Sequence, residues 1–171
     1  KKLRVLGRAG IGVDNIDINA ATNNGIVVMN TPFGNSITTA EHTISLMMSL
    51  ARNIPQASQS TKEGKWEKSK FMGTELFGKT LGMIGCGNIG SLVVERCLGL
   101  KMKVFVFDPF LSKDQTEKIG AKKVELEEIL INSDFITLHT PLTDKTKGIL
   151  NKNNLSKLSI FNCTYFIYEI D

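Results

Sequence analysis

The sequence predicts an α/β fold in which helices cover both faces of a doubly wound parallel sheet. Two observations lead to this prediction. Short apolar segments of strand length alternate with helical patterns and short connections along most of the 171 residues. In addition, residues 80–108 combine a strand, a glycine-rich turn, a helix and a second strand in one β-α-β unit. The expected spatial order of the five strands is 3-2-1-4-5.

Two strands and two helices are predicted before the β-α-β unit. Asn24-Gly25 stops the first helix. In the longer second helix, Thr38 and Glu41 have the spacing of a capping box, and an apolar stripe that includes methionines indicates a face packed into the core. The predicted ranges are a strand at 3–8, a helix at 17–23, a strand at 26–29 and a long helix from Ser36 into the region of Pro55.

The loop after the first strand contains Gly10 and Gly12 next to Arg8. Its exposed backbone N–H groups and the guanidinium together suit a carboxylate or a phosphate. A tight strand-to-helix connection accounts for the same spacing, so both interpretations stand.

Residues 64–78 form a polar break after the long helix. Lysines here alternate with Glu63 and Glu67, a pattern typical of a solvated surface. Trp66 fits an oligomer interface if it is exposed, or a cover over the edge of the sheet. His42 is expected to be packed or to lie in an interface.

Gly85, Gly87 and Gly90 have the Gly-x-Gly-x-x-Gly spacing between a strand at 80–84 and a helix. In such a unit the first glycine permits a tight turn and the second lets a pyrophosphate approach the backbone. The third glycine lets the helix pack on the sheet. The N–H groups at the amino end of the helix then face an anion. A glycine-rich turn without a ligand is the alternative interpretation.

Asp108 follows a strand at 103–107 and lies 18 residues beyond Gly90. A carboxylate at this place accepts hydrogen bonds from ribose hydroxyls and repels a 2′-phosphate, and residues 109–112 contain no arginine to hold such a phosphate. The sequence therefore predicts NAD, rather than NADP, as the cofactor.

Strands and helices continue to alternate beyond Asp108. His139 and Thr140 follow a buried strand at the edge where doubly wound sheets bind ligands, so they are either cofactor contacts or a simple loop cap. The predicted ranges are strands at 122–124, 135–138 and 160–162 and helices at 126–131 and 151–158.

Composition excludes several classes of protein. The net charge of +4 is small and the lysines are scattered, so no nucleic-acid partner is expected. No apolar stretch reaches the ~18 residues of a membrane helix, and the three cysteines lack metal-ligand spacing. We therefore expect no membrane partner and a cytoplasmic location with reduced thiols. Cys86, in the glycine turn, fits either a thiol of lowered pKa or a small residue that the turn tolerates.

With these motifs assembled, the sequence resembles the D-isomer specific 2-hydroxyacid dehydrogenase family. Phe-Met-Gly-Thr-Glu-Leu at residues 71–76 indicates the phosphoglycerate branch. The resemblance runs from residue 1 to about residue 163. The other matching stretches are residues 7–17, 28–36, 40–42, 64–66, 85–90 and 139–142.

The resemblance implies a Rossmann-like NAD-binding domain and NAD-dependent oxidation of the small-molecule substrate 3-phosphoglycerate, in serine biosynthesis. In the family, a histidine paired with a carboxylate takes the hydroxyl proton and an arginine holds the substrate carboxylate. The implied cofactor contacts are Asn88 and Ile89 at the pyrophosphate, Asp108 at the ribose, Thr140 near the adenosine and Ile11 near the nicotinamide, together with Gly85, Gly87, Gly90, His139 and Cys163. The implied substrate contacts are Arg8, Ala9, Gly10 and Gly12.

The sequence departs from the family after Cys163. In the family this segment reads Asn-Cys-Ala-Arg-Gly-Gly. Here Asn162-Cys163 matches its first two residues, but Thr164 and aromatic residues follow, and Tyr165 takes the place of the arginine. We expect a chain truncated at both ends, with residues 1–33 as a remnant of the substrate domain. Residues 34–171 are then the linking helix and an NAD-binding domain that is incomplete after about residue 163.

Because the catalytic arginine, glutamate and histidine are missing, no catalytic residue is assigned and no turnover is expected. The alternatives are an NAD-binding interaction or regulatory module, an inactive gene fragment, or a fragment that does not fold stably. The full-length family is expected to form homo-oligomers through the region of the long helix and Trp66.

Overall fold

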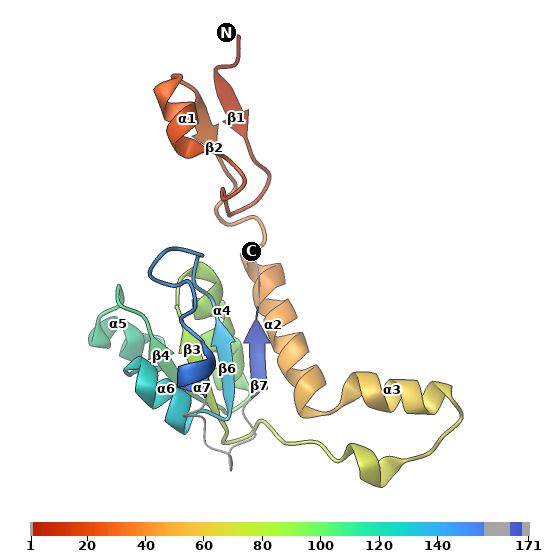
Figure 1. Cartoon of the computed structure of the whole chain (residues 1–171). Helices are drawn as coiled ribbons and strands as arrows, with labels where there is room; N and C mark the ends of the chain where they lie inside the picture. The colour runs from red at the N-terminus through yellow and green to blue at the C-terminus, as the bar shows by residue number, and fades with distance from the viewer. Residues whose placement is uncertain (1, 156–164, 169–171) are drawn as a thin grey trace.

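A computed structural model of the chain describes residues 2–155 and 165–168. Strands in this part form two parallel sheets, one with the order β1-β2 and one with the order β5-β4-β3-β6-β7 (Figure 1). The larger sheet has the predicted order 3-2-1-4-5, which confirms the doubly wound α/β fold. The strands are β1 (Val5–Gly7), β2 (Val27–Met29), β3 (Thr80–Ile84), β4 (Lys103–Phe107), β5 (Lys122–Lys123), β6 (Phe135–Leu138) and β7 (Tyr165–Tyr168).

Local sequence signals account for several helix boundaries. The Asp17 side chain caps α1 by accepting a hydrogen bond from Ala20 N at 2.8 Å. Ser112 and Gln115 form a capping box at the start of α5, a helix that was not predicted. No helix in the described part of the chain is long and apolar enough to cross a membrane. The helices are α1 (Ile18–Asn23), α2 (Ser36–Ala51), α3 (Ile54–Lys62), η1 (Lys68–Phe71, a 3-10 helix), α4 (Asn88–Gly99), α5 (Lys113–Lys118), α6 (Leu126–Asn132) and α7 (Lys152–Leu155).

The long predicted helix is in fact two helices, α2 and α3. Asn53 between them has a left-handed backbone with φ of 52°. Pro55 then lies in the first turn of α3, where its missing N–H is tolerated. The turn at Asn53 therefore redirects the chain before Pro55, and α2 does not continue into this region.

The predicted capping box at Thr38 and Glu41 is wrong. The N-cap of α2 is Asn35, so Thr38 already lies inside the helix and cannot cap it. The spacing of a capping box occurs here by coincidence, because Ser36 has entered the helix before it.

Two hydrophobic clusters cover the larger sheet. One packs α2 and α4 against β3, β4 and β6 and contains Met47, Val93 and Phe135, each fully buried. The methionine-containing stripe of α2 is therefore core, as predicted. The other cluster joins Ile129 of α6 to Ile136 of β6. The helices thus lie on both faces of the sheet, as a doubly wound fold requires.

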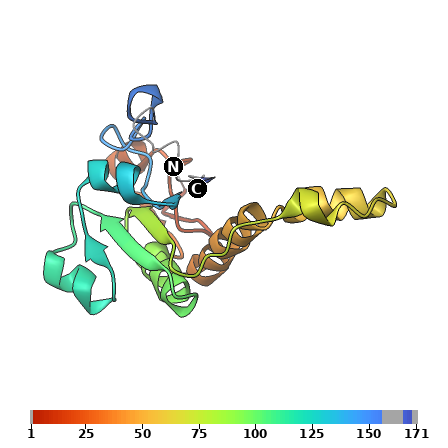
Figure 2. The same ribbon diagram turned by 90° about the horizontal axis from the view of Figure 1, so that it is seen from below.

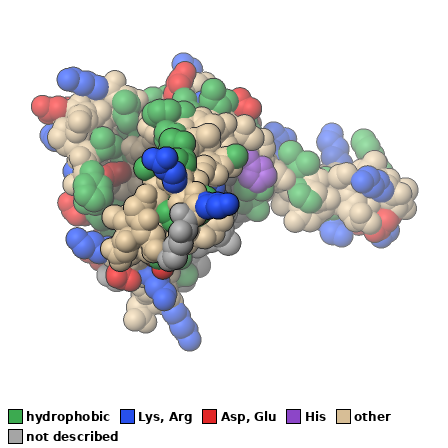
Figure 3. Space-filling view, turned by 90° about the horizontal axis from the view of Figure 1, so that it is seen from above, with side chains coloured by type: hydrophobic (Ala, Val, Ile, Leu, Met, Phe, Trp, Pro, Cys, Tyr) green, Lys and Arg blue, Asp and Glu red, His purple; other side chains and the backbone are tan. Residues whose placement is uncertain are grey.

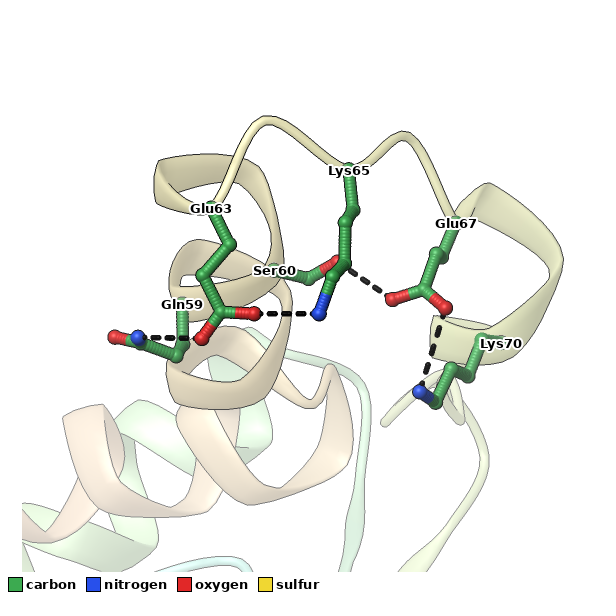
Figure 4. Close-up of polar contacts among 6 residues, drawn as sticks. All are labelled: Gln59, Ser60, Glu63, Lys65, Glu67 and Lys70. Carbon is green, nitrogen blue, oxygen red and sulfur yellow. Dashed lines mark hydrogen bonds and ion pairs between the residues drawn. The ribbon is translucent and has the colours of Figure 1, made fainter.

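Residues 52–78 form an arm that projects from the body of the molecule (Figures 2 and 3). Polar contacts hold its tip together (Figure 4): the Ser60 hydroxyl donates to Glu67 at 2.8 Å and Lys65 pairs with Glu63 at 2.7 Å. The first contact lowers the pKa of Glu67 and the second lowers that of Glu63. The predicted solvated surface is confirmed, and Trp66 is 85% exposed rather than a cover for the sheet.

The fifth strand of the larger sheet is β7. It comprises Tyr165–Tyr168 and pairs in parallel with β6, so that Tyr165 lies opposite Phe135. That Tyr165 takes the place of the family's arginine stays a prediction. Aromatic and β-branched residues favour strands, which fits Tyr-Phe-Ile-Tyr better than it fits a loop. The predicted strand at 160–162 and Cys163 lie outside the described residues.

Close packing of α6 on β3 makes Gly82 sensitive to substitution. A Cβ at Gly82 would lie 2.7 Å from Ile129 Cγ2 and still closer to Ser133 Oγ. We predict that Gly82→Ala lowers the free energy of unfolding by about 1–3 kcal/mol, the usual cost of overpacking a core, as measured by urea denaturation. The control is Gly99→Ala at the end of α4, where nothing lies within 4 Å. Equal stability of the two variants would contradict this packing.

Candidate cofactor site

The register of the large sheet brings the predicted cofactor residues to one edge. Ile84 at the end of β3 pairs with Phe107 of β4 and with Leu138 of β6. The next residue of each strand is therefore level with the others at the carboxyl edge of the sheet. These three residues are Gly85, Asp108 and His139.

Two of the three glycines are required by the packing of the turn itself. Gly85 has φ of 85°, and a Cβ there would lie 2.6 Å from the carbonyl oxygen of His139 and from Thr140 Cγ2. Gly90 is buried in α4, where a Cβ would lie 2.9 Å from Gly85 O. These glycines thus let the turn, the helix and the strand end after β6 approach each other closely, as predicted.

Gly87 differs, because a Cβ there would meet no atom of the protein within 4 Å. Its φ of −78° lies outside the left-handed region that favours glycine. Gly87 is the N-cap of the 12-residue helix α4, and as a glycine it has no side chain that could cap the helix. Exposed Asn88 and half-buried Ile89 follow it in the first turn. The open space and the uncapped amino end together form a cradle for an anion.

Asp108 connects the glycine turn to the end of β4. Its side chain is 9% exposed, and each carboxylate oxygen accepts one backbone hydrogen bond at 2.8 Å, from Cys86 N and from Phe110 N. A carboxylate has about four acceptor positions, so two remain for hydroxyl donors of a ligand. The sequence predicted the ligand role of Asp108 but not its bonds to the turn, because these depend on the pairing of β3 with β4.

Cys86 is buried beside this carboxylate. Burial and, second, the charge of Asp108 raise the pKa of its thiol to about 11. The alternative of a thiol with lowered pKa is therefore wrong, since desolvation outweighs the nearby helix end. Cys86 is a small residue packed into the turn.

His139 and Thr140 are both half-buried at the site. Burial lowers the pKa of His139 to about 4, so its ring is neutral at neutral pH. The ring Nε2 lies 2.9 Å from the hydroxyl of Thr137, a buried partner that sequence analysis did not identify. The backbone N–H of His139 donates to Ile84 O at 2.8 Å, which fixes this segment against the glycine turn.

The loop of residues 8–12 belongs to the smaller sheet. The Arg8 guanidinium folds over Gly10, and a second loop holds the first in place: Thr31 N donates to Gly10 O at 3.0 Å, and Asn30 Nδ2 donates to Ile11 O at 2.8 Å. Among the described residues, no hydrogen bond joins this loop to the glycine turn. The structure thus places the predicted substrate residues in a separate loop, and Ile11, a predicted cofactor contact, lies in that loop and not at the glycine turn.

His42 is exposed on α2, so it is not packed within the chain; its interpretation as an interface residue stays a prediction. No group of three or more metal-ligating side chains occurs among the described residues.

The glycine cradle, the acidic strand end and the parallel sheet define a dinucleotide-binding α/β domain. Comparison with known proteins identifies the family within this class. Residues 44–161 match the family model of the D-isomer specific 2-hydroxyacid dehydrogenase NAD binding domain. The chain therefore belongs to the D-isomer specific 2-hydroxyacid dehydrogenase family and contains its NAD-binding domain.

Individual relatives support this assignment. The chain is 56% identical to D-3-phosphoglycerate dehydrogenase of Archaeoglobus fulgidus, with 92% of this chain and 30% of the relative covered. It is 49% identical to the enzyme of the same name from Bacillus subtilis, with 94% and 31% covered. Among solved structures, D-lactate dehydrogenase from Aquifex aeolicus complexed with NAD and lactic acid matches with a TM-score of 0.87, 30% identity, and 97% and 49% covered. The chain thus spans about 30% of the length of these curated relatives.

The neutral state of His139 predicts a pH dependence of stability. Its pKa of about 4 lies below the value of 6.5 for an unburied histidine, so the unfolded chain takes up this proton first as the pH falls. Between pH 6.5 and 4, His139 should lower the free energy of unfolding by up to about 1.4 kcal/mol per pH unit. The measurement is chemical denaturation of the chain and of His139→Gln at several pH values. The variant should show a shallower loss; equal slopes would contradict the assigned state.

Proposed function

We propose that residues 85–90, Asp108 and Thr140 bind NAD. The observation that supports this most directly is the position of Gly87 at the uncapped amino end of α4, where a Cβ would meet no protein atom and the space is open to an anion. Asn88 and Ile89 would offer first-turn N–H groups to the pyrophosphate. The free acceptor positions of Asp108 would take the ribose hydroxyls and repel a 2′-phosphate.

We assign the remaining predicted contacts by the family resemblance. Thr140 and His139 would lie on the adenosine side, and Ile11 would approach the nicotinamide from the smaller sheet. Cys163 stays a predicted contact outside the described residues.

For the reaction, we propose NAD-dependent oxidation of 3-phosphoglycerate, based on the names of the two relatives reported above. The substrate would lie against Arg8, Ala9, Gly10 and Gly12, where backbone N–H groups and the guanidinium suit its anionic groups. A bound NAD would supply the hydride acceptor for oxidation at the substrate C2, and a base would accept the hydroxyl proton.

The proton-transferring pair is, in our proposal, not among these 171 residues. His42 is exposed on α2, and the ring of His139 lies against Thr137 inside the NAD-binding domain. Loss of a general base typically reduces a rate by ~10²–10⁴. The chain by itself is therefore proposed to bind NAD without turnover.

We further propose that residues 1–33 belong to a substrate domain and residues 34–171 to the NAD-binding domain. The separate two-stranded sheet and the start of α2 at Ser36 support this division. The described cysteines are buried free thiols, which fits a cytoplasmic enzyme.

The projecting arm supports a homo-oligomer. Trp66, Met72 and Phe77 on it are 85%, 81% and 74% exposed, and several exposed apolar side chains on one projecting segment suit a protein–protein contact. A second copy of the chain is the proposed partner.

Gly87→Ala tests the cofactor proposal with little risk to the fold. The added methyl group meets no protein atom, so thermal stability should not change. It would occupy the path of the pyrophosphate, so the Kd for NAD should rise at least about tenfold, or about 1.4 kcal/mol, by calorimetry.

The matched control is Gly99→Ala, at the other end of the same helix and also without neighbours within 4 Å. This variant should bind NAD as the unmodified chain does. Unchanged affinity of Gly87→Ala, or no binding of NAD to the unmodified chain, would contradict the proposal.

A further inference from the structure

Thr137 is a buried polar residue in the interior of the larger sheet. It lies in β6, and its backbone pairs with Met83 of β3 on one side and with Ile167 of β7 on the other. Its side chain is only 1% exposed and lies on the same face of β6 as Phe135, which belongs to the hydrophobic cluster with α2 and α4. A hydroxyl in such a position is costly unless it is hydrogen-bonded. The partner of this hydroxyl therefore indicates what Thr137 does.

That partner is the ring of His139. Thr137 Oγ1 lies 2.9 Å from His139 Nε2, and the hydroxyl makes no other hydrogen bond within residues 2–155 and 165–168. Burial lowers the pKa of His139 to about 4, so the ring is neutral and has one N–H and one acceptor nitrogen. A hydroxyl both donates and accepts, so it can serve either nitrogen. The contact thus holds a neutral ring in one orientation.

His139 precedes Thr140, the residue assigned above to the adenosine side of NAD. After β6 ends at Leu138, one backbone bond ties this segment to β3 in the described part of the chain, from His139 N to Ile84 O at 2.8 Å. Thr140 makes no hydrogen bond to another described residue, so its position depends on packing. Thr140 Cγ2 and His139 O both lie 2.6 Å from where a Cβ of Gly85 would be. A small movement of His139 would therefore disturb Thr140 and the glycine turn together.

We propose that Thr137 is a positioning residue for the cofactor. Its hydroxyl holds the His139 ring, and the ring holds residues 139–140 in the arrangement that receives the adenosine side of NAD. Thr137 does not touch the ligand, because it is buried within the sheet. This inference rests on the proposed function, since it assumes NAD at residues 85–90, Asp108 and Thr140.

Thr137→Val is the direct test. Valine keeps the branched shape but removes the hydroxyl, which leaves His139 Nε2 without this partner. The ring should then sample several orientations, and NAD would bind only the fraction of molecules with the right one, so its Kd should rise about tenfold by calorimetry. Thr137→Ser keeps the hydroxyl and should retain the affinity of the unmodified chain. Unchanged affinity in Thr137→Val, or the same loss in Thr137→Ser, would overturn the proposal.

Thr43→Val is the matched control. Thr43 is also 1% exposed, and its hydroxyl donates to Thr39 O at 3.0 Å within α2. The substitution removes a buried hydroxyl from another element, so it should leave the Kd for NAD unchanged whatever its effect on the melting temperature. An equal loss of NAD affinity in Thr43→Val and Thr137→Val would show a general loss of structure and would overturn the specific role of Thr137.

A double-mutant cycle tests whether Thr137 acts through the ring. His139→Leu removes the same hydrogen bond from the other side, so Thr137→Val should cause no further loss of NAD affinity in that background. Additive losses would overturn the route through His139. The nitrogen resonances of the imidazole give a second readout: Thr137→Val should shift that of Nε2 and Thr43→Val should not, and an unshifted Nε2 in Thr137→Val would contradict the contact. If Thr137→Val does not fold, unchanged NAD affinity in His139→Leu overturns the proposal.

Binding of NAD to the unmodified chain separates this inference from the proposed function. If the unmodified chain binds NAD and Thr137→Val binds it equally well, only the role of Thr137 is refuted. If the unmodified chain does not bind NAD, the cofactor site and this inference are both refuted.

Discussion

The hydrogen bonds of Asp108 are the constraint on which the site depends. One nearly buried carboxylate accepts the N–H groups of Cys86 and Phe110 at 2.8 Å and so joins the glycine turn after β3 to the end of β4. Hydrogen bonds to a charged acceptor are stronger than those between neutral groups. They fix the turn in the shape that leaves Gly87 facing open space. Burial and, second, this carboxylate raise the pKa of the Cys86 thiol, so the thiol in the turn is neutral.

Close packing around the glycine turn also fixes its shape. Gly85 and Gly90 are glycines because the chain after β6 and the turn itself approach within 3 Å of where a Cβ would lie. Gly87 is a glycine although nothing approaches it. The difference separates residues that shape the site from a residue that leaves room for a ligand. Together with the position of Gly87 at the uncapped amino end of α4, this open space supports a cofactor at this place.

Sequence reasoning predicted the features that depend on local pattern. The glycine spacing, the terminal Asp108 and the strand order all follow from alternating apolar segments and turn residues. Two predictions failed at the ends of α2. Asn53 adopts a left-handed conformation that divides one predicted helix into two, and Asn35 takes the cap position from Thr38. The pairing of Phe135 with Tyr165 adds a strand at 165–168 that the sequence analysis did not predict, whereas the predicted strand at 160–162 lies outside the described residues.

Calorimetric titration of the unmodified chain with NAD and with NADP tests the central claim most directly. Asp108 has acceptor positions for ribose hydroxyls and a charge that opposes a 2′-phosphate. The account predicts saturable binding of NAD with one ligand per chain and at least tenfold weaker binding of NADP. Equal affinity for the two dinucleotides would contradict the role given to Asp108. Absence of binding by either would contradict the assignment of the cofactor site to these residues.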